Sequence, residues 1–250
     1  MSSTTAILPA RALELGLADL KNWRTAAAQR LAGLRRWATV ERLIDEQTAA
    51  RLAHLERRLG TERLTVAFVA EYSRGKSELV NALFFADLGT RLLPSGVGRT
   101  TLCPTEILWD ASRPPSIRLL PIGTRESPKA LREYLSEPEA WHEVALNPAR
   151  PEEVATACQA LSEALNVAGP AAVNLGLAAE STGRIDIPRW RYAIINYPHP
   201  LLESGLTILD TPGHNTMGTE PELTVHRIPD AAAIVFMLGA DTGEIGRAHV

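Results

Sequence analysis

The stretch from Leu64 to Leu83, LTVAFVAEYSRGKSELVNAL, constrains the fold of this chain more than any other. Its first part is rich in β-branched and aromatic residues, which predicts a buried strand. Its last part repeats apolar residues at helical spacing. Gly75-Lys76-Ser77 lies between the two parts. The sequence therefore predicts a strand, a phosphate-binding loop and a helix in that order.

The loop carries nearly all of the GxxxxGK[ST] pattern, but Ala70 stands at the position of the first glycine. Backbone N–H groups at a helix N-terminus favour a polyphosphate. Lys76 is expected to reach the β- and γ-phosphates, and the Ser77 hydroxyl is expected to ligate Mg²⁺. An ordinary strand-to-helix turn that contains Gly-Lys-Ser is the alternative. The expected nucleotide-binding residues in this stretch are Tyr72, Ser73, Arg74, Gly75, Lys76, Ser77 and Glu78.

A second motif, Asp210-Thr211-Pro212-Gly213, follows the apolar stretch Leu206 to Leu209. A strand that ends in DxxG is typical of the second half of a nucleotide switch. Asp210 can hold Mg²⁺ through a water molecule, and the Gly213 N–H can contact a γ-phosphate. DxxG is a weak signal alone, but it becomes strong downstream of a phosphate loop and directly after a strand.

The remaining pattern indicates an α/β fold with an incomplete, mixed, mostly parallel sheet flanked by helices. Between the two motifs we expect a hairpin of two short strands and then a helical insert over about residues 124–183. The expected strands are Thr105–Trp109 and Ser116–Leu120 in the hairpin, then Tyr192–Tyr197, Leu206–Leu209 and a buried strand at Ala231–Leu238, and the insert is expected to be helical over Ser127–Tyr134 and Pro151–Leu165.

Residues 11–59 contain no proline and repeat apolar residues at helical spacing, which predicts an N-terminal helical segment. Residues 1–60 carry 10 Lys/Arg and 6 Asp/Glu, whereas residues 61–250 carry 16 and 23. The helices should therefore have a basic outer face. That face is either a solvated surface or one that contacts lipid or a partner.

Composition excludes several classes of protein. The net charge of −3 and the absence of a concentrated basic face argue against nucleic-acid binding. Cys103 and Cys158 have neither disulfide-framework nor zinc-site spacing, which fits a reducing cytoplasm. The longest apolar run, Ala231 to Ala240, is too short to span a bilayer, so any membrane contact should be peripheral.

These motifs resemble those of the bacterial dynamin-like GTPases. The resemblance rests on three stretches and covers roughly residues 60–243. They are Ala70 to Ser77, Leu92-Leu93-Pro94 leading to Pro104-Thr105-Glu106-Ile107, and Tyr197-Pro198 leading to Asp210-Thr211-Pro212-Gly213.

The resemblance implies roles for individual residues. Thr101 matches the switch threonine that ligates Mg²⁺ and closes over the γ-phosphate, with Thr100 as a near-equivalent competitor. Ser73 matches a position that helps to organise charge compensation. Arg74 is either an arginine acting in cis on developing charge or an exposed side chain that shapes the loop or a dimer face. The catalytic set implied is Ser73, Arg74, Lys76, Thr101 and Gly213, and the expected Mg²⁺ ligands are Ser77, Thr101 and, through water, Asp210.

The same resemblance implies a division into domains and a function. Residues 1–60 would be a helical segment of the stalk-joining type, and residues 61–243 a truncated GTPase domain. The chain would hydrolyse GTP with Mg²⁺, self-assemble through the GTPase domain, and remodel or tether membranes from the cytoplasm, peripherally at the inner membrane. One alternative is a soluble ribosome-associated type of GTPase, favoured only by His214. Another is a nucleotide-sensing scaffold with little turnover.

Two features depart from the family pattern. Ala70 lacks the conformational freedom of glycine, and no [NT]KxD motif, which would read guanine, follows the strand expected at Ala231–Leu238. Residues 244–250, EIGRAHV, can be back-translated as an in-frame sequencing adapter. We therefore expect this tail to be non-native and the natural protein to continue past Gly243 into the guanine-reading strand and a helical stalk.

Overall fold

The computed structural model describes residues 7–60, 63–70, 75–86, 91–94, 102–177, 182–211 and 231–238. The chain divides into two units. One comprises Met1–Leu64 and Pro200–Leu206, and the other Thr65–His199 and Thr207–Val250.

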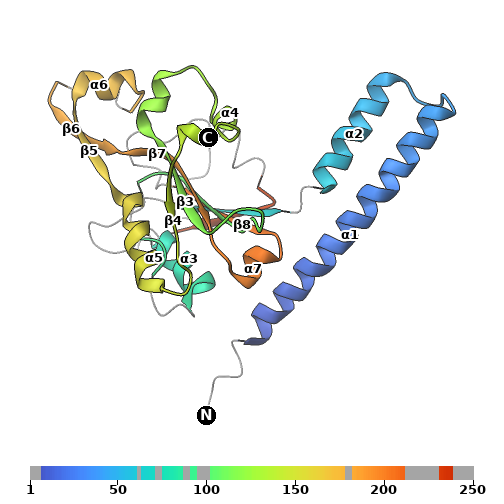
Figure 1. Cartoon of the computed structure of the whole chain (residues 1–250), viewed down its shortest axis with the longest axis horizontal. Coiled ribbons are helices and arrows are strands. Elements are labelled where there is room, and N and C mark those ends of the chain that lie inside the picture. The colour runs from blue at the N-terminus through green and yellow to red at the C-terminus, as the bar shows by residue number, and fades with distance from the viewer. Residues whose placement is uncertain are drawn as a thin grey trace, which may run out of the picture. The chain divides into compact units, whose positions relative to one another are not determined.

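The first unit is built around a helical hairpin of α1 (Ile7–Val40) and α2 (Glu46–Gly60), shown at one side of Figure 1. The predicted N-terminal helical segment is thereby confirmed. The Arg35 guanidinium donates to the Glu56 carboxylate across the hairpin. This contact raises the pKa of Arg35 and lowers the pKa of Glu56. The charged pair therefore fixes one helix against the other in register.

The turn between these helices has a defined stop and start. Arg42 has a φ of 56°, and the Leu43 N–H donates to the Ala38 carbonyl at 2.8 Å, which closes the end of α1. The Asp45 carboxylate accepts a hydrogen bond from the Thr48 N–H at 2.7 Å and so caps α2. This bond lowers the pKa of Asp45.

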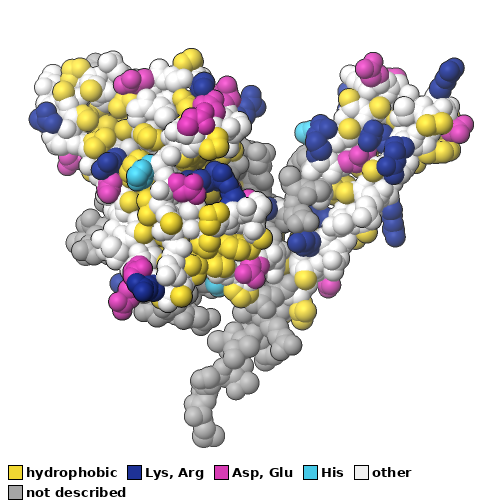
Figure 2. Space-filling view, in the orientation of Figure 1, with side chains coloured by type: hydrophobic (Ala, Val, Ile, Leu, Met, Phe, Trp, Pro, Cys, Tyr) yellow, Lys and Arg dark blue, Asp and Glu magenta, His cyan; other side chains and the backbone are white. Residues whose placement is uncertain are grey.

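The outward surface of the hairpin is less polar than its sequence pattern suggested. Leu34, Val40 and Leu43, which belong to the apolar repeat, are exposed, as are Trp23 and Trp37. In Figure 2 the hairpin shows Lys and Arg side chains interspersed with hydrophobic ones. Within the described residues, no helix is both long enough and apolar enough to cross a bilayer.

The second unit contains a seven-stranded sheet in the order β4-β3-β7-β2-β8-β1-β9. Two of the pairings, β1 with β9 and β2 with β7, are parallel. Three others, β2 with β8, β3 with β7 and β3 with β4, are antiparallel. The predicted α/β class with a mixed sheet is confirmed. The strands are β1 (Leu64–Ala70), β2 (Thr105–Leu108), β3 (Ser116–Pro121), β4 (His142–Ala145), β7 (Trp190–Asn196), β8 (Leu206–Asp210) and β9 (Ala233–Met237).

The helices of this unit are short. They are α3 (Lys76–Phe84), α4 (Leu131–Tyr134), α5 (Pro151–Cys158) and α6 (Gly169–Asn174), with 3₁₀ turns at Ile122–Glu126, Pro138–Ala140 and Gln159–Ser162. A further short helix, α7 (Pro200–Glu203), precedes β8 and belongs to the first unit. One apolar cluster joins the sheet to the segment that follows β3, through Tyr134 and Trp141 packed with Tyr192, Ile194 and Leu209. This core fixes β8, whose last residue is Asp210, within the sheet.

The predicted hairpin of the strands at 105–109 and 116–120 is wrong. Both strands exist, but β7 lies between β2 and β3 and pairs with each of them. All seven residues of β7 are buried, so this strand fits a central position in the sheet better than an edge.

The expectation that residues 124–183 form a helical insert is wrong in part. Its helix α5 ends at Cys158 rather than Leu165, and the segment also contributes β4 to the sheet. The strand β5 (Ala164–Ala168) pairs with β6 (Arg184–Pro188) as a separate two-stranded ribbon. Ile187 of this ribbon packs with Ala172 of α6 in a small core. A second hydrophobic centre thus stabilises part of this segment.

The predicted strand at Ala231–Leu238 exists as β9, but it is not buried. It forms the last strand in the sheet order, and Ile234 and Phe236 are 52% and 57% exposed. An edge strand packs on one neighbour only, which explains why the apolar run in the sequence did not translate into burial.

Candidate functional site

The phosphate-loop helix begins where the sequence motif placed it. Gly75 is the residue before α3 and has a φ of 76°, a conformation that glycine adopts without strain. Lys76 and Ser77 then form the first turn of α3, directly beyond the carboxyl end of β1. Ala70, the departure from the motif, is the last residue of β1 and pairs with Met237 of β9. Its extended backbone suits an ordinary residue, so the loss of this glycine is tolerated here.

The two sequence motifs meet at one point. The Ser77 hydroxyl donates to Asp210 Oδ2 at 2.9 Å, and Lys76 Nζ lies 3.6 Å from Asp210 Oδ1. Asp210 is fully buried, and Lys76 is 9% exposed. A buried carboxylate, an ammonium group and a hydroxyl therefore converge at the start of α3.

Thr211 holds this arrangement in place. Its hydroxyl donates to the Phe68 carbonyl of β1 at 2.8 Å, and its N–H donates to the same oxygen at 3.4 Å. Thr105 of β2 lies opposite Asp210 in the sheet register and is fully buried. Asp210 is thus fixed from both sides, by β1 and by β2. The sequence contained Thr211 within DTPG, but the pattern alone assigned it no role.

The oxygen donors fit a hard divalent cation. Mg²⁺ prefers hydroxyl, carboxylate and water oxygens, and the Ser77 hydroxyl and Asp210 carboxylate supply the first two. The start of a nine-residue helix adds backbone N–H groups that suit phosphate oxygens. The described part of this site can therefore hold a polyphosphate together with Mg²⁺.

Not every predicted site residue is brought to this point. The Glu78 carboxylate accepts from Arg91 Nη2 at 2.8 Å on the surface of α3, rather than joining Lys76 and Ser77. Several others lie outside the described residues, so their roles stay predictions. These are Tyr72, Ser73, Arg74, Thr100, Thr101, Gly213 and His214.

Sequence reasoning missed Asn81. It lies in α3 and is 5% exposed, and its side-chain amide makes two hydrogen bonds to the backbone of Leu93. The signal was present in the sequence as one polar residue inside the apolar helical run LVNAL. A buried amide needs hydrogen-bond partners, so this position indicated a specific contact.

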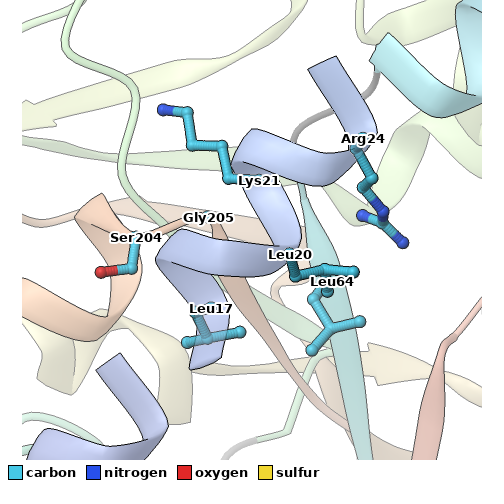
Figure 3. A pocket seen from close by; sticks show the side chains of 7 residues that line it. All are labelled: Leu17, Leu20, Lys21, Arg24, Leu64, Ser204 and Gly205. Carbon is cyan, nitrogen blue, oxygen red and sulfur yellow. The ribbon is translucent and has the colours of Figure 1, made fainter. Parts of the chain in front are cut away.

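A separate depression in the first unit has a different character (Figure 3). Leu20 of α1 and Leu64 lie together there, whereas the charged ends of Lys21 and Arg24 point in opposite directions. The Leu64 N–H donates to the Gly205 carbonyl at 2.7 Å along its wall. The polar groups do not converge, so this depression lacks the chemistry of the site around Lys76.

Comparison with solved structures gives two similar chains. Both are described as an oligomerised bacterial dynamin pair that provides a mechanism for the long-range sensing and tethering of membranes. They are 15% and 14% identical to this chain, with TM-scores of 0.42 and 0.43. Each comparison covers 94% of this chain but 29% of the solved one. No curated protein matches the sequence.

The family comparison is more extensive. The sequence model of the dynamin family matches residues 66–245, which include both nucleotide motifs and all of the described site around Lys76 and Asp210. This match spans well over half of the sequence, and the chain therefore belongs to the dynamin family of GTPases.

Proposed function

We propose that this chain binds GTP with Mg²⁺ and hydrolyses its terminal phosphoanhydride bond. One observation carries the proposal, namely that Lys76 and Ser77 at the start of α3 meet the buried Asp210 at the end of β8. These are the groups that phosphoryl transfer needs, because catalysis there depends on positioning and charge stabilisation.

Each described residue has a part in this proposal. Lys76 is the cation for the β- and γ-phosphates, and it exchanges Asp210 for phosphate oxygens when nucleotide binds. Ser77 and Asp210 would hold Mg²⁺, which supplies charge neutralisation at the phosphates when bound. Gly75 allows the backbone to turn into α3, so that the first N–H groups of the helix face the phosphates.

The predicted residues outside the described part complete the proposal. Thr101 and the Gly213 N–H would sense the γ-phosphate, while Ser73 and Arg74 would compensate charge in the loop. Selection of guanine rests on family membership, because the chain has no [NT]KxD motif after β9.

The wider role is also proposed from the family. We propose nucleotide-dependent self-association through the GTPase domain, with membrane remodelling or tethering by a protein that is cytoplasmic and peripheral at the inner membrane. The similar solved structures are described as an oligomerised pair that tethers membranes. The chain spans 29% of their length, so the self-association and lipid contact of a full-length protein are part of the proposal.

Phosphate release measured with GTP and Mg²⁺, with and without vesicles of anionic phospholipid, tests this function. Turnover that rises with protein concentration and with vesicles supports the whole proposal. Tight GTP binding without phosphate release would contradict hydrolysis and favour a nucleotide-sensing scaffold. Turnover that does not respond to vesicles would contradict the membrane role. Lys129→Ala, which removes a lysine at the surface, serves as a matched control for Lys76→Ala.

A further inference from the structure

The segment Leu92–Pro94 is attached to the phosphate-loop helix by a side chain. Asn81 Nδ2 donates to the Leu93 carbonyl at 2.8 Å, and Asn81 Oδ1 accepts from the Leu93 N–H at 2.8 Å. Leu92 and Leu93 are almost completely buried. One amide therefore satisfies both polar backbone groups of a buried residue.

Only asparagine suits this geometry. Aspartate has the same shape but, when ionised, offers no donor to the Leu93 carbonyl. Alanine would leave the Leu93 N–H and carbonyl without these bonds in a buried setting, which is costly. Glutamine is one methylene longer in a packed site. The contact thus depends on the identity of residue 81, not only on its polarity.

The position of Asn81 links this contact to the nucleotide site. Residues four apart lie on the same face of a helix, so Asn81 lies one turn after Ser77 on that face of α3. Ser77 contacts Asp210, while Asn81 contacts Leu93. A second tie, from Glu78 to Arg91, joins the same two segments at the surface.

The chain is held again where it returns to the sheet. The Leu102 N–H donates to the Leu161 carbonyl at 3.1 Å, and the Pro104 carbonyl accepts from the Ala193 N–H at 2.9 Å. Thr105, the next residue, lies opposite Asp210 in the β2–β8 register. The chain therefore leaves from the helix that carries Ser77 and re-enters the sheet beside Asp210.

We propose that Asn81 is a positioning residue for the GTPase reaction, which fixes Leu92–Pro94 to the phosphate-loop helix and so sets where the chain departs relative to bound nucleotide. This inference rests on the proposed function. It predicts that loss of the amide lowers kcat more than it weakens nucleotide binding. A small misplacement of groups around a reacting centre can cost about 100-fold in rate.

The test compares Asn81→Ala with Val80→Ala, which removes methyl groups from the fully buried neighbouring residue of the same helix. We expect Asn81→Ala to lower kcat for GTP by about tenfold or more, with GDP affinity changed by less than about threefold. Val80→Ala should lower the melting temperature comparably but keep kcat within about twofold of the starting protein. Equal losses of kcat in both variants would show a merely structural role and overturn the proposal.

Asn81→Asp supplies a second readout that separates the donor from general packing. A protonated carboxyl can donate to the Leu93 carbonyl as the amide does. The kcat of this variant, divided by that of the starting protein, should therefore rise as the pH falls from about 8 to about 6. A ratio that stays flat would contradict the donor role, and it can be measured even if Asn81→Ala fails to fold.

Hydrogen exchange at the Leu93 amide completes the design. Exchange should accelerate in Asn81→Ala but not in Val80→Ala, and unchanged exchange would overturn the contact itself. If the starting protein bound no GTP, the proposed function would fail and this inference with it. If it turned over GTP and Asn81→Ala did so equally well, only the inference would fail.

Discussion

Removal of the charges on Lys76 and Asp210 should destabilise the nucleotide-free protein in a coupled way. The two groups are 3.6 Å apart, and their side chains are 9% and 0% exposed. Their attraction at an effective dielectric constant of about 20 is about 5 kcal/mol. Desolvation of both charges opposes this attraction, so we expect a net coupling free energy of about 2 kcal/mol.

A double-mutant cycle measures this coupling. Lys76→Met should lower the free energy of unfolding by about 3 kcal/mol, because it leaves the Asp210 carboxylate buried without its cation. Lys76→Met combined with Asp210→Asn should cost less than the sum of the two single changes. Urea unfolding without nucleotide, followed by circular dichroism, gives the four free energies that the cycle requires.

The exposed pair Arg150–Glu153 is a matched control. Its atoms are closer, at 2.6 Å, but both side chains are more than half exposed. Distance alone would rank this pair as the stronger, whereas burial predicts that its coupling is small. A coupling below about 0.5 kcal/mol for Lys76 and Asp210 would refute the reasoning, as would a larger value for the control pair.

Three further predictions concern the scaffold. Arg42→Gly should raise the melting temperature, because glycine relieves about 1 kcal/mol of strain at a φ of 56°, and a lower value would contradict the strain. Asp45→Ala should lower the melting temperature at neutral pH, because the cap on the Thr48 N–H is lost. Since the pKa of Asp45 is lowered in the folded state, its stabilisation is present above the unfolded pKa and is lost as the pH falls through the folded one. The difference between the two proteins in thermal melts should therefore shrink in acid, and a constant difference would oppose the capping role. Cys103 and Cys158 are buried, and burial raises the pKa of Cys158 to about 12. Both thiols should react with a disulfide reagent only after unfolding in urea, and rapid labelling of the native protein would contradict their burial.

The sequence predicted those parts of the fold that depend on local patterns. The strand, loop and helix from Leu64 to Leu83 are specified by short-range periodicity and by Gly75, and the structure agrees. DxxG also marked the correct end of β8, because a buried strand and its terminal aspartate are adjacent in sequence.

Long-range pairing could not be predicted in the same way. β7 lies between β2 and β3 although it follows them by about 70 residues, and no local pattern encodes this neighbour choice. The exposure of Phe236 likewise depends on which strands flank β9. The contact between Asn81 and Leu93 joins residues whose complementarity becomes visible only when their backbones are adjacent.

The most direct test of the central claim is the equilibrium affinity of the chain for a fluorescent GTP analogue with Mg²⁺. We predict saturable binding by the starting protein and by Lys129→Ala. Lys76→Ala should bind about 100-fold more weakly, because a charged contact to the phosphates is lost. Equal affinity of Lys76→Ala and the starting protein would contradict the assignment of Lys76 and the phosphate loop.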